Sequence, residues 1–467
     1  MTEPKTRQAK DAGARQGRRH EEATVPDATR AVVIHPFLRG EQAKLAHDAR
    51  AAAKTLPSEA RLEEAVGLAR AINLDVVDSG LVPMTKARPA TLIGSGKVEE
   101  LKGAIQAHDA GLVIIDYVVS PIQQRNLEKA WNAKVLDRTS LILEIFGARA
   151  RTKEGRLQVE LAHLLYQRSR LVRSWTHLER QRGGFGFLGG PGETQIEADR
   201  RMIGDRIDAI KRELLGVRRT RELHRESRRR VPFPTIALAG YTNAGKSTLF
   251  NSLTKAEVTA EDALFATLDP TMRRLDLPGG GKVILSDTVG FISELPTTLV
   301  AAFRATLEEV SEADIILHVR DIAANYSEQQ KHDVEHVLTE LGVETAEGAT
   351  NIVEVWNKAD LLDDARRAHV ETLAARGENP PVLVSAATGE GLDRLKRRIE
   401  ERISAGHVLR AFRIDASEGA LINWLYEHGE VRGRHDHDDG TIELEVRMAE
   451  AVAERFEHMR GEGSGKA

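Results

Sequence analysis

Eight consecutive residues, Gly240 to Ser247, have the types and spacing that bind phosphate. They read G-Y-T-N-A-G-K-S, follow an apolar run and precede Thr248-Leu249-Phe250. A strand, a G-x-x-x-x-G-K-S loop and a helix start form a P-loop, whose glycines let backbone N–H groups surround phosphate oxygens. The N-terminus of the helix adds positive charge. The residues we expect to bind the phosphates are Gly240, Tyr241, Thr242, Asn243, Ala244, Gly245, Lys246, Ser247 and Thr248.

Two of these side chains have distinct expected roles. Lys246 should reach the terminal phosphates, and the Ser247 hydroxyl should coordinate Mg²⁺. A P-loop by itself indicates only a nucleoside triphosphate, so the base has to be identified from residues elsewhere in the chain.

A second motif, N-K-A-D at Asn357–Asp360, follows the apolar stretch 351–356 and so lies at the carboxyl end of a predicted strand. Ligands of open α/β sheets bind at that end. The Asp360 carboxylate can accept hydrogen bonds from N1–H and the 2-amino group of guanine, a donor pair that adenine lacks. Another predicted strand leads to an S-A loop expected to pack on the base through backbone amides. The expected base-binding residues are Asn357, Lys358, Asp360, Ser385, Ala386 and Ala387.

A third motif, D-T-V-G at Asp287-Thr288-Val289-Gly290, follows the predicted strand 282–286. Asp287 should hold Mg²⁺ through water, and the Gly290 N–H should contact the γ-phosphate. Upstream, the segment 264–271 is the expected first switch, in which a threonine closes over the metal when GTP is bound. Phe291 stands where many small GTPases have a water-orienting glutamine, so we expect slow intrinsic hydrolysis that is assisted from outside.

Together these motifs predict a GTPase, and their residues resemble those of the Obg–HflX group of translation-factor-class GTPases. Four further stretches resemble the HflX family: I-G-S-G-K-V-E-E-L from Ile93, Asp137-Arg138-Thr139, E-G-R-L-Q-V-E-L-A from Glu154, and G-P-G-E-T-Q-I-E from Gly190. The resemblance covers the chain from about residue 30 to its end. It selects Thr267 rather than Thr271 as the switch threonine, which gives Lys246, Thr267 and Gly290 as expected catalytic residues and Ser247, Thr267 and Asp287 as metal-binding residues.

The family resemblance implies a GTPase that binds the large ribosomal subunit and its RNA and separates or rescues stalled ribosomes. The alternative is an RNA-binding assembly factor for which GTP only regulates affinity. Some relatives imply ATP use by the N-terminal domain, but no second complete P-loop supports it. Asn243 occupies a position where similar potassium-dependent GTPases hold K⁺ with an asparagine; the other interpretation is that Asn243 braces the loop.

The length and composition of the chain limit the number of domains and the class of protein. The chain has 467 residues, 41% of them hydrophobic and 30% charged, which is typical of a globular protein of about three domains. The absence of cysteine excludes a disulfide framework and a thiolate metal site. No apolar run approaches the roughly 20 residues of a membrane span, and the N-terminus lacks a signal-peptide core, so we expect a cytoplasmic protein. We also expect a monomer that does not bind DNA.

The expected fold class is α/β: a P-loop GTPase domain after a small parallel α/β domain and a long helical hairpin, and before a small α+β domain. Alternating strands and helices predict the first α/β domain, and a glycine-permitted helix cap is the favoured interpretation of Gly94–Lys97. The loop 434–440 has metal-capable side chains but is better interpreted as a hairpin turn. The expected boundaries are 1–29 for a disordered arm, then 30–148, 149–231, 232–405 and 406–467.

The stretch 149–230 carries 21 Lys and Arg against 11 Asp and Glu, although the whole chain has a net charge of −4. Apolar residues recur there at steps of three and four, which predicts two amphipathic helices packed antiparallel. The glycine-rich tip between them includes Phe185, Phe187 and Leu188. Arginines can engage RNA phosphates and aromatic side chains can stack on unpaired bases, so the hairpin is a candidate RNA probe. The alternative is a solvated charged coiled coil.

Overall fold

The structure is a computed structural model. It describes residues 29–40, 55–181, 191–229, 233–255, 264–265, 267–268, 271–293, 307, 309–345, 351–376, 379–405 and 407–463, without the side chains of 172–196, 218 and 220–229 in the long helices. The expected arm, and the expected tip contacts of Phe185, Phe187 and Leu188, lie outside the described residues.

The first domain is a four-stranded parallel sheet in the order β2-β1-β3-β4. Side chains alternate along β1: Ala31 and Val33 face one apolar cluster with Leu68 of α3, whereas Val32 and Ile34 face another with Trp131 of α5. Helices therefore cover both faces, as parallel strands require. The elements are β1 (Arg30–Leu38), α3 (Ser58–Arg70), β2 (Asp75–Met84), α4 (Ser95–Ala107), β3 (Leu112–Ile115), α5 (Pro121–Trp131), β4 (Lys134–Asp137) and α6 (Arg138–Arg149).

Local signals fix the helix starts of this domain. Ser120 and Gln123 form a reciprocal capping box before Pro121 of α5, which satisfies backbone N–H groups that have no partner inside the helix. The Asp137 carboxylate caps α6 by accepting from Ser140 N at 2.8 Å. Gly94 stands at the N-cap of α4, in agreement with the cap interpretation of that glycine stretch.

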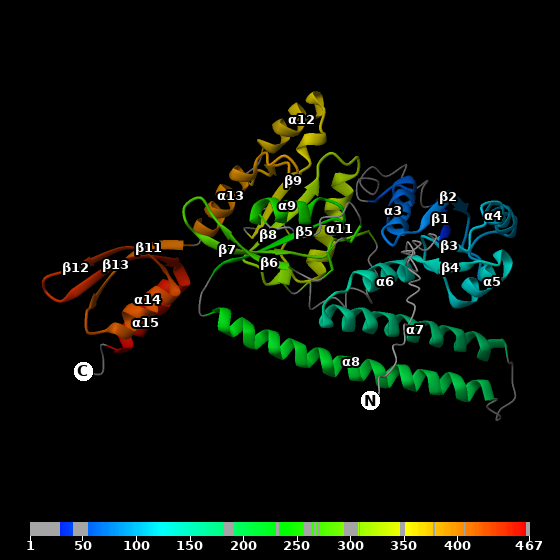
Figure 1. The fold of residues 1–467 in the computed structure, drawn as a ribbon, viewed down its shortest axis with the longest axis horizontal. Helices are drawn as coiled ribbons and strands as arrows, with labels where there is room; N and C mark the ends of the chain where they lie inside the picture. Colours follow the sequence, from blue (N-terminus) through cyan, green and yellow to red (C-terminus); the bar gives the residue numbers. More distant parts are fainter. Residues whose placement is uncertain are drawn as a thin grey trace, which may run out of the picture.

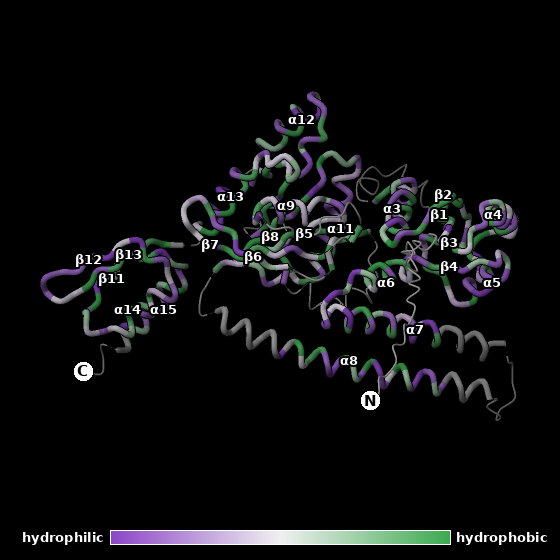
Figure 2. The backbone as a smooth tube through the Cα atoms, viewed as in Figure 1, coloured by the Kyte–Doolittle hydropathy of each residue, from purple (hydrophilic) through white to green (hydrophobic). Residues whose placement is uncertain are grey.

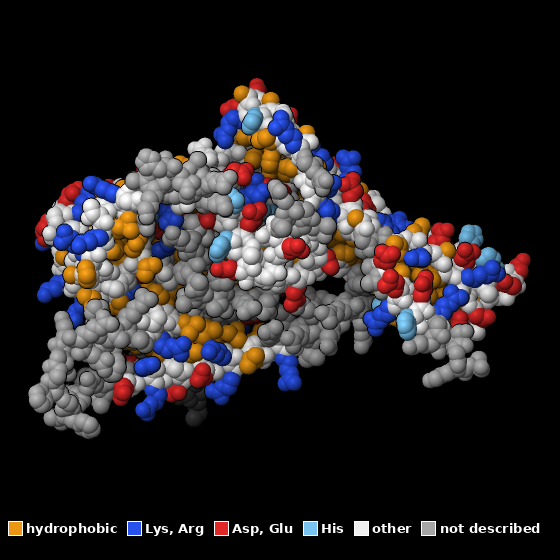
Figure 3. Space-filling view, turned by 180° about the vertical axis from the view of Figure 1, so that it is seen from behind, with side chains coloured by type: hydrophobic (Ala, Val, Ile, Leu, Met, Phe, Trp, Pro, Cys, Tyr) orange, Lys and Arg blue, Asp and Glu red, His pale blue; other side chains and the backbone are white. Residues whose placement is uncertain are grey.

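Two long helices follow, α7 (Lys153–Gln181) and α8 (Pro191–Arg229), and they lie alongside each other below the two sheets in Figure 1. Leu157 and Leu161 of α7 pack against Ile207 and Ile210 of α8 in a closed apolar seam. Arg206 reaches across to Glu160 with two N–H donors at 2.7 and 2.8 Å. Blue Lys and Arg side chains project from the lower edge of the molecule, where these helices lie (Figure 3).

The P-loop domain, residues 235–405, has a six-stranded sheet in the order β10-β9-β8-β5-β7-β6, in which only β6 runs antiparallel to its neighbour. Hydrophobic stretches run through the central strands of this sheet and the first one (Figure 2). Its elements are β5 (Thr235–Gly240), α9 (Lys246–Thr254), β6 (Thr271–Asp276), β7 (Lys282–Asp287), β8 (Ile315–Asp321), α11 (Ser327–Glu340), β9 (Ile352–Asn357), η1 (Ala359–Leu361), α12 (Asp364–Ala374), β10 (Val382–Leu383) and α13 (Leu392–Ala405).

The last domain is an antiparallel sheet, β11-β13-β12, whose apolar face is covered by two helices. Phe412 contacts Phe456 edge-on, with ring centroids 4.8 Å apart. The 434–440 stretch forms the end of β12 and the turn to β13, and Gly440 N closes the turn by donating to His437 O at 3.1 Å. The elements are β11 (His407–Asp415), α14 (Gly419–His428), β12 (Glu430–Asp436), β13 (Thr441–Ala449) and α15 (Glu450–Gly463).

This architecture confirms the predicted fold class. The first domain also contacts the P-loop domain directly, because one apolar cluster includes residues of both, and Phe146 of α6 meets Phe265 edge-on at 4.8 Å. The phosphate-binding motif is therefore packed against another domain as well as its own sheet.

Candidate nucleotide site

The P-loop connects β5 to α9, and two of its glycines have no room for a side chain. A Cβ on Gly240 would lie 2.2 Å from Val319 O of β8, and one on Gly245 would lie 2.3 Å from Asn357 Nδ2. Gly245 is also the N-cap of α9 with φ 87°, a conformation that favours glycine. The loop is thus held in place by the neighbouring strand β8 and by the N-K-A-D motif.

The Lys246 ammonium lies in a buried position inside this loop. Its Nζ donates to Gly240 O at 3.1 Å and to Tyr241 O at 2.8 Å. Burial lowers the pKa of Lys246 to about 8, partly opposed by the nearby Asp287 carboxylate. A buried cation beside a helix N-terminus is well placed for anionic phosphate oxygens.

Three oxygens that the sequence assigns to the metal converge at one point. Ser247 Oγ and Thr267 Oγ1 lie 2.9 Å apart, and they are 2.7 and 2.9 Å from Asp287 Oδ2. Burial raises the pKa of Asp287, an effect that hydrogen bonds from these hydroxyls reduce. The other oxygen, Oδ1, is buried without a hydrogen-bond partner among the described residues.

This donor set fits Mg²⁺. Neighbouring ligands of an octahedral Mg²⁺ at 2.0–2.1 Å are about 2.9 Å apart, which is the Ser247–Thr267 spacing. Hydroxyl and carboxylate oxygens are its preferred ligands. Thr271, the alternative switch threonine, is the first residue of β6. The metal role of Thr267 itself stays a prediction.

The D-T-V-G segment lies directly against the P-loop. Thr242 N donates to Phe291 O at 2.7 Å, and Phe291 N donates to Gly240 O at 3.1 Å. Thr288 Oγ1 anchors the segment by donating to Leu238 O at 2.5 Å. A Cβ on Gly290 would lie 3.0 Å from both Lys246 Nζ and Thr242 Cγ2, so this glycine packs against the Lys246 ammonium.

The base end is organised by Asn357, which is buried and bridges two loops. Its Nδ2 donates to Ala244 O at 2.9 Å, and its Oδ1 accepts from Ala386 N at 3.0 Å. The Asp360 side chain is exposed, and Ser385 Oγ holds it by donating to Oδ1 at 2.6 Å. The structure therefore brings the P-loop, N-K-A-D and S-A loops together, with Asn357 as a brace between them.

Asn243 has left-handed backbone geometry, φ 58°, and an exposed side chain. Among the described residues, the structure gives this side chain no hydrogen-bond partner. The structure therefore shows no loop-bracing hydrogen bond from the Asn243 side chain, and the K⁺ contact stays a prediction.

Sequence reasoning missed a buried polar cluster that joins the first domain to the P-loop. Arg138 donates to Asp116 and Glu64, each at 2.5 Å, and to Ser293 O at 2.8 Å. The Tyr241 hydroxyl donates to Glu64 and accepts from Ser293 N at 2.9 Å. We call these five residues the interdomain cluster.

Burial and the neighbouring charges together set the pKa values in the interdomain cluster. The pKa of Tyr241 rises well above its usual value because the hydroxyl is buried next to the Glu64 carboxylate. Although burial acts in the opposite direction, Asp116 and Glu64 raise the pKa of Arg138 and hold it charged. Asp116 also accepts from His35 Nδ1 at 2.8 Å. Arg138 lies in one of the family-like stretches, but its partners are 22 to 155 residues away, so no sequence pattern links them.

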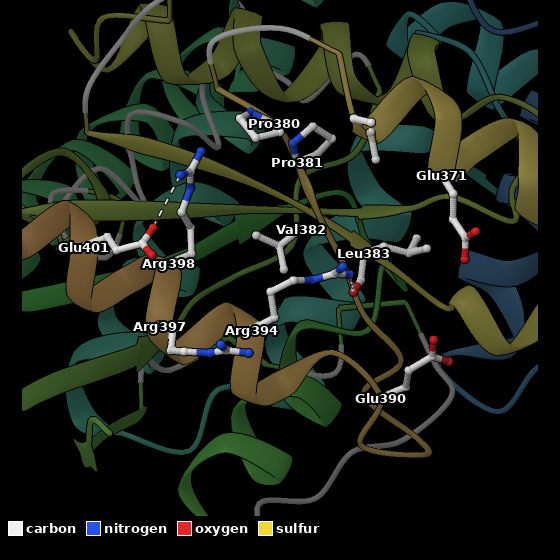
Figure 4. A pocket seen from close by; sticks show the side chains of 12 residues that line it. Glu371, Pro380, Pro381, Val382, Leu383, Glu390, Arg394, Arg397, Arg398 and Glu401 are labelled. Carbon is white, nitrogen blue, oxygen red and sulfur yellow. Dashed lines mark hydrogen bonds and ion pairs between the residues drawn. The ribbon is translucent and has the colours of Figure 1, made fainter. Parts of the chain in front are cut away.

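A groove of about 630 Å³ opens in the P-loop domain along the edge strand β10, between α12 and α13 (Figure 4). Arg394 crosses it and donates to Leu383 O at 2.8 Å, and Arg398 lies 3.5 Å from Glu401. Prolines 380 and 381 precede the strand, which limits the backbone N–H groups at this edge. No residue of the P-loop or of N-K-A-D lines the groove.

No helix in the described part of the chain is both long and apolar enough to cross a membrane.

Comparison with known proteins identifies four matching regions. They match models of a GTP-binding GTPase N-terminal region (59–147), a GTP-binding GTPase middle region (149–228), a 50S ribosome-binding GTPase (235–358) and an HflX C-terminal domain (371–467). A solved structure of SsGBP in complex with GDP has a TM-score of 0.45 and 24% sequence identity, and the match covers 80% of this chain and 98% of that one.

Two curated relatives match over most of their length. The GTPase HflX of Magnetococcus marinus is 50% identical over 396 residues, which cover 85% of this chain and 90% of the relative. The GTPase HflX of Escherichia coli is 43% identical over 411 residues, which cover 88% of this chain and 94% of the relative. The chain is thus a GTP-binding and GTP-hydrolysing protein with a ribosome-binding GTPase domain, and it belongs to the HflX family of GTPases.

Proposed function

We propose that this GTPase docks on the large ribosomal subunit in its GTP-bound form and splits or rescues stalled ribosomes, with hydrolysis stimulated by the ribosome. The main support for this proposal is that the Phe291 side chain is buried. Its ring is 1% exposed and packs in the apolar cluster shared by the two domains. An aromatic ring cannot orient a nucleophilic water by hydrogen bonding, so fast turnover needs help from outside this position.

The long helices support an RNA partner. The stretch 149–230 has ten more basic than acidic residues, and phosphate contacts from such a surface give strong, salt-dependent binding. The apolar seam of the helix pair is closed on itself, which leaves its charged outer face for a ligand. We expect the tip residues Phe185, Phe187 and Leu188 to reach unpaired bases of the ribosomal RNA.

Within the site, we propose a role for each of the residues predicted from the sequence. Ser247, Thr267 and, through water, Asp287 would hold Mg²⁺, which supplies charge neutralisation at the phosphates when bound. Lys246 and the Gly290 N–H would bind the terminal phosphate, and Asp360 would select guanine. Asn243 would help hold K⁺. We also propose that the protein acts as a cytoplasmic monomer, since its partner is the ribosome.

The interdomain cluster offers a physical link between nucleotide state and the rest of the molecule. Tyr241 belongs to the P-loop and Ser293 follows the D-T-V-G-F segment, and both contact Glu64 of α3. A change of the segment that contacts the γ-phosphate would therefore alter contacts of the first domain.

Purified large subunits provide the decisive experiment. We expect them to stimulate GTP hydrolysis, and we expect the protein to sediment with them in a non-hydrolysable GTP analogue but not in GDP. Binding without stimulation would instead support the assembly-factor alternative, in which GTP only regulates affinity. Replacing Phe185, Phe187 and Leu188 by serine should weaken ribosome function and leave intrinsic hydrolysis unchanged; if ribosome affinity is also unchanged, the tip has no contact role.

A further inference from the structure

Because the Phe291 ring is buried in the apolar cluster, some other group has to face the attacking water during intrinsic hydrolysis. The backbone of Phe291 is committed as well, since its N–H and C=O both bond to the P-loop. These bonds hold the backbone of Phe291 in place. Rotation of its side chain cannot give the water a hydrogen-bonding partner, because the ring has no polar atom. The P-loop side of the same contact is therefore the place to look.

Thr242 stands opposite the D-T-V-G glycine. Its backbone N–H is already bonded to Phe291 O at 2.7 Å, whereas its hydroxyl Oγ1 is buried with no hydrogen-bond partner among the described residues. A buried hydroxyl without a partner loses about 1–3 kcal/mol relative to one that is hydrogen-bonded. Such a group in a binding site is a candidate contact for the ligand.

The Thr242 side chain faces Gly290 through its methyl group. Thr242 Cγ2 and Lys246 Nζ each lie 3.0 Å from the point that a Cβ on Gly290 would occupy. Lys246 and Gly290 are the two groups assigned above to the terminal phosphate. One step between staggered rotamers, about 120°, would place Oγ1 where Cγ2 now lies, facing Gly290.

We propose that the Thr242 hydroxyl orients the water that attacks the γ-phosphorus. The inference rests on the proposed placement of the terminal phosphate beside Lys246 and Gly290. In the reaction, the water oxygen forms a bond to phosphorus, the bond from phosphorus to the β–γ bridging oxygen breaks, and GDP leaves with the electron pair. A proton of the water ends on the released phosphate, and Thr242 accepts a hydrogen bond from the water without taking that proton.

This role predicts an effect on the hydrolysis step and none on nucleotide binding. The water contact exists only when the water is in line for attack, so its loss lowers kcat and leaves ground-state affinity unchanged. A purely structural Thr242, which shapes the loop by packing, would instead affect GTP and GDP affinity together with the rate.

Three variants separate these outcomes. Thr242→Val keeps the branched shape and removes the hydroxyl, Thr242→Ser keeps the hydroxyl and removes the methyl, and Thr242→Ala removes both. Thr242 is absent from the residues with positive φ, so valine fits its backbone conformation. The readouts are single-turnover GTP hydrolysis, with and without large ribosomal subunits, and affinity for GDP, for a GTP analogue and for GDP with aluminium fluoride.

We expect Thr242→Val and Thr242→Ala to slow intrinsic hydrolysis by about 10- to 100-fold, the effect of losing one hydrogen bond in the transition state, with GDP and GTP-analogue affinities within threefold of the parent. Thr242→Ser should stay within about threefold in rate. Affinity for the aluminium fluoride complex, which mimics the transition state, should fall in Thr242→Val and Thr242→Ala only.

Equal rates in Thr242→Val and the parent would overturn the inference. So would a serine variant as slow as the valine variant, or a loss of GDP affinity that matches the loss of rate. The intrinsic rate decides this question without the ribosome. If large subunits fail to stimulate the parent, the proposed ribosomal function fails while the assignment of Thr242 is still tested.

Discussion

The two ends of the nucleotide site differ in what supports them. At the base end, Asn357, Asp360 and Ser385 contact one another's loops and the P-loop, all within one domain. At the phosphate end, Tyr241 and Ser293 are bonded to Glu64 and Arg138 of another domain. The contacts proposed for guanine therefore depend on one domain, whereas the groups proposed to surround the γ-phosphate are also bonded to the first domain. The difference teaches that one site can combine base contacts built within a single domain with phosphate contacts that a second domain can influence.

The largest expected effect comes from removing the ion pairs between the two domains, which tests whether the phosphate end depends on the first domain. Arg138→Met should destabilise the protein by about 3–5 kcal/mol, because the buried Glu64 and Asp116 carboxylates lose their cation. Chemical denaturation measures the loss. In the folded fraction we expect an altered hydrolysis rate with unchanged selectivity for guanine over adenine.

Arg206→Met is the matched control for the loss of an arginine ion pair. Arg206 pairs with Glu160 on the exposed face of the helices, where screening by solvent leaves an ion pair little net effect on stability. If the two variants lose the same free energy of unfolding, burial does not make the ion pairs of the interdomain cluster more important for stability than an exposed pair.

The next largest effect concerns the phosphate end alone. Lys246→Ala and Ser247→Ala should each reduce single-turnover hydrolysis by roughly 10²–10³-fold, since they remove phosphate and metal contacts made in the transition state. Both variants should still bind guanine nucleotides in preference to adenine nucleotides, because the base end of the site is unchanged. Unchanged turnover in both variants would contradict the assignment of the P-loop.

At the base end, Asp360→Asn should weaken GTP binding by about 1–3 kcal/mol, because an amide cannot accept both guanine donors. Xanthosine triphosphate, which has an oxygen in place of the 2-amino group, should bind the variant better than it binds the parent. Equilibrium titration measures both affinities. Undiminished GTP affinity would show that Asp360 does not contact the base.

The smallest expected effect is a pH dependence of phosphate binding. The pKa of Lys246 is lowered to about 8 by burial, so the free site loses its cation as pH rises through 8. Bound phosphates raise this pKa again, so binding takes up a proton above pH 8. GTP affinity should then fall by up to about tenfold over the next pH unit. Lys246→Ala should lack this dependence, and an equal slope in that variant would assign it to another group.

The sequence predicted the local parts of the site well. The P-loop, D-T-V-G and N-K-A-D motifs lie at strand ends, as expected, because their backbone conformations are set by nearby residues such as Gly240 and Gly245. The alternation of strands and helices likewise indicated the α/β class. Short elements such as β4, with four residues, carry too few positions for a periodic pattern.

Contacts between distant residues could not be predicted. Glu64 is 177 residues from Tyr241 and 229 from Ser293, and a buried carboxylate in an amphipathic helix has no local signature that distinguishes it from a solvated one. The choice of Thr267 came from family resemblance, because spacing alone does not separate it from Thr271. Packing of the two domains, rather than any motif, brings the interdomain cluster together.

The 39-residue helix α8 gives the molecule a mechanical property. At 1.5 Å per residue it is about 58 Å long, and only five residues separate its end from β5, the strand that leads into the P-loop. A tilt of about 5° at that end displaces the far end by about 5 Å, since displacement grows with length. A tilt too small to rearrange the nucleotide site would thus move the distant end of the helix by about the distance between neighbouring β-strands.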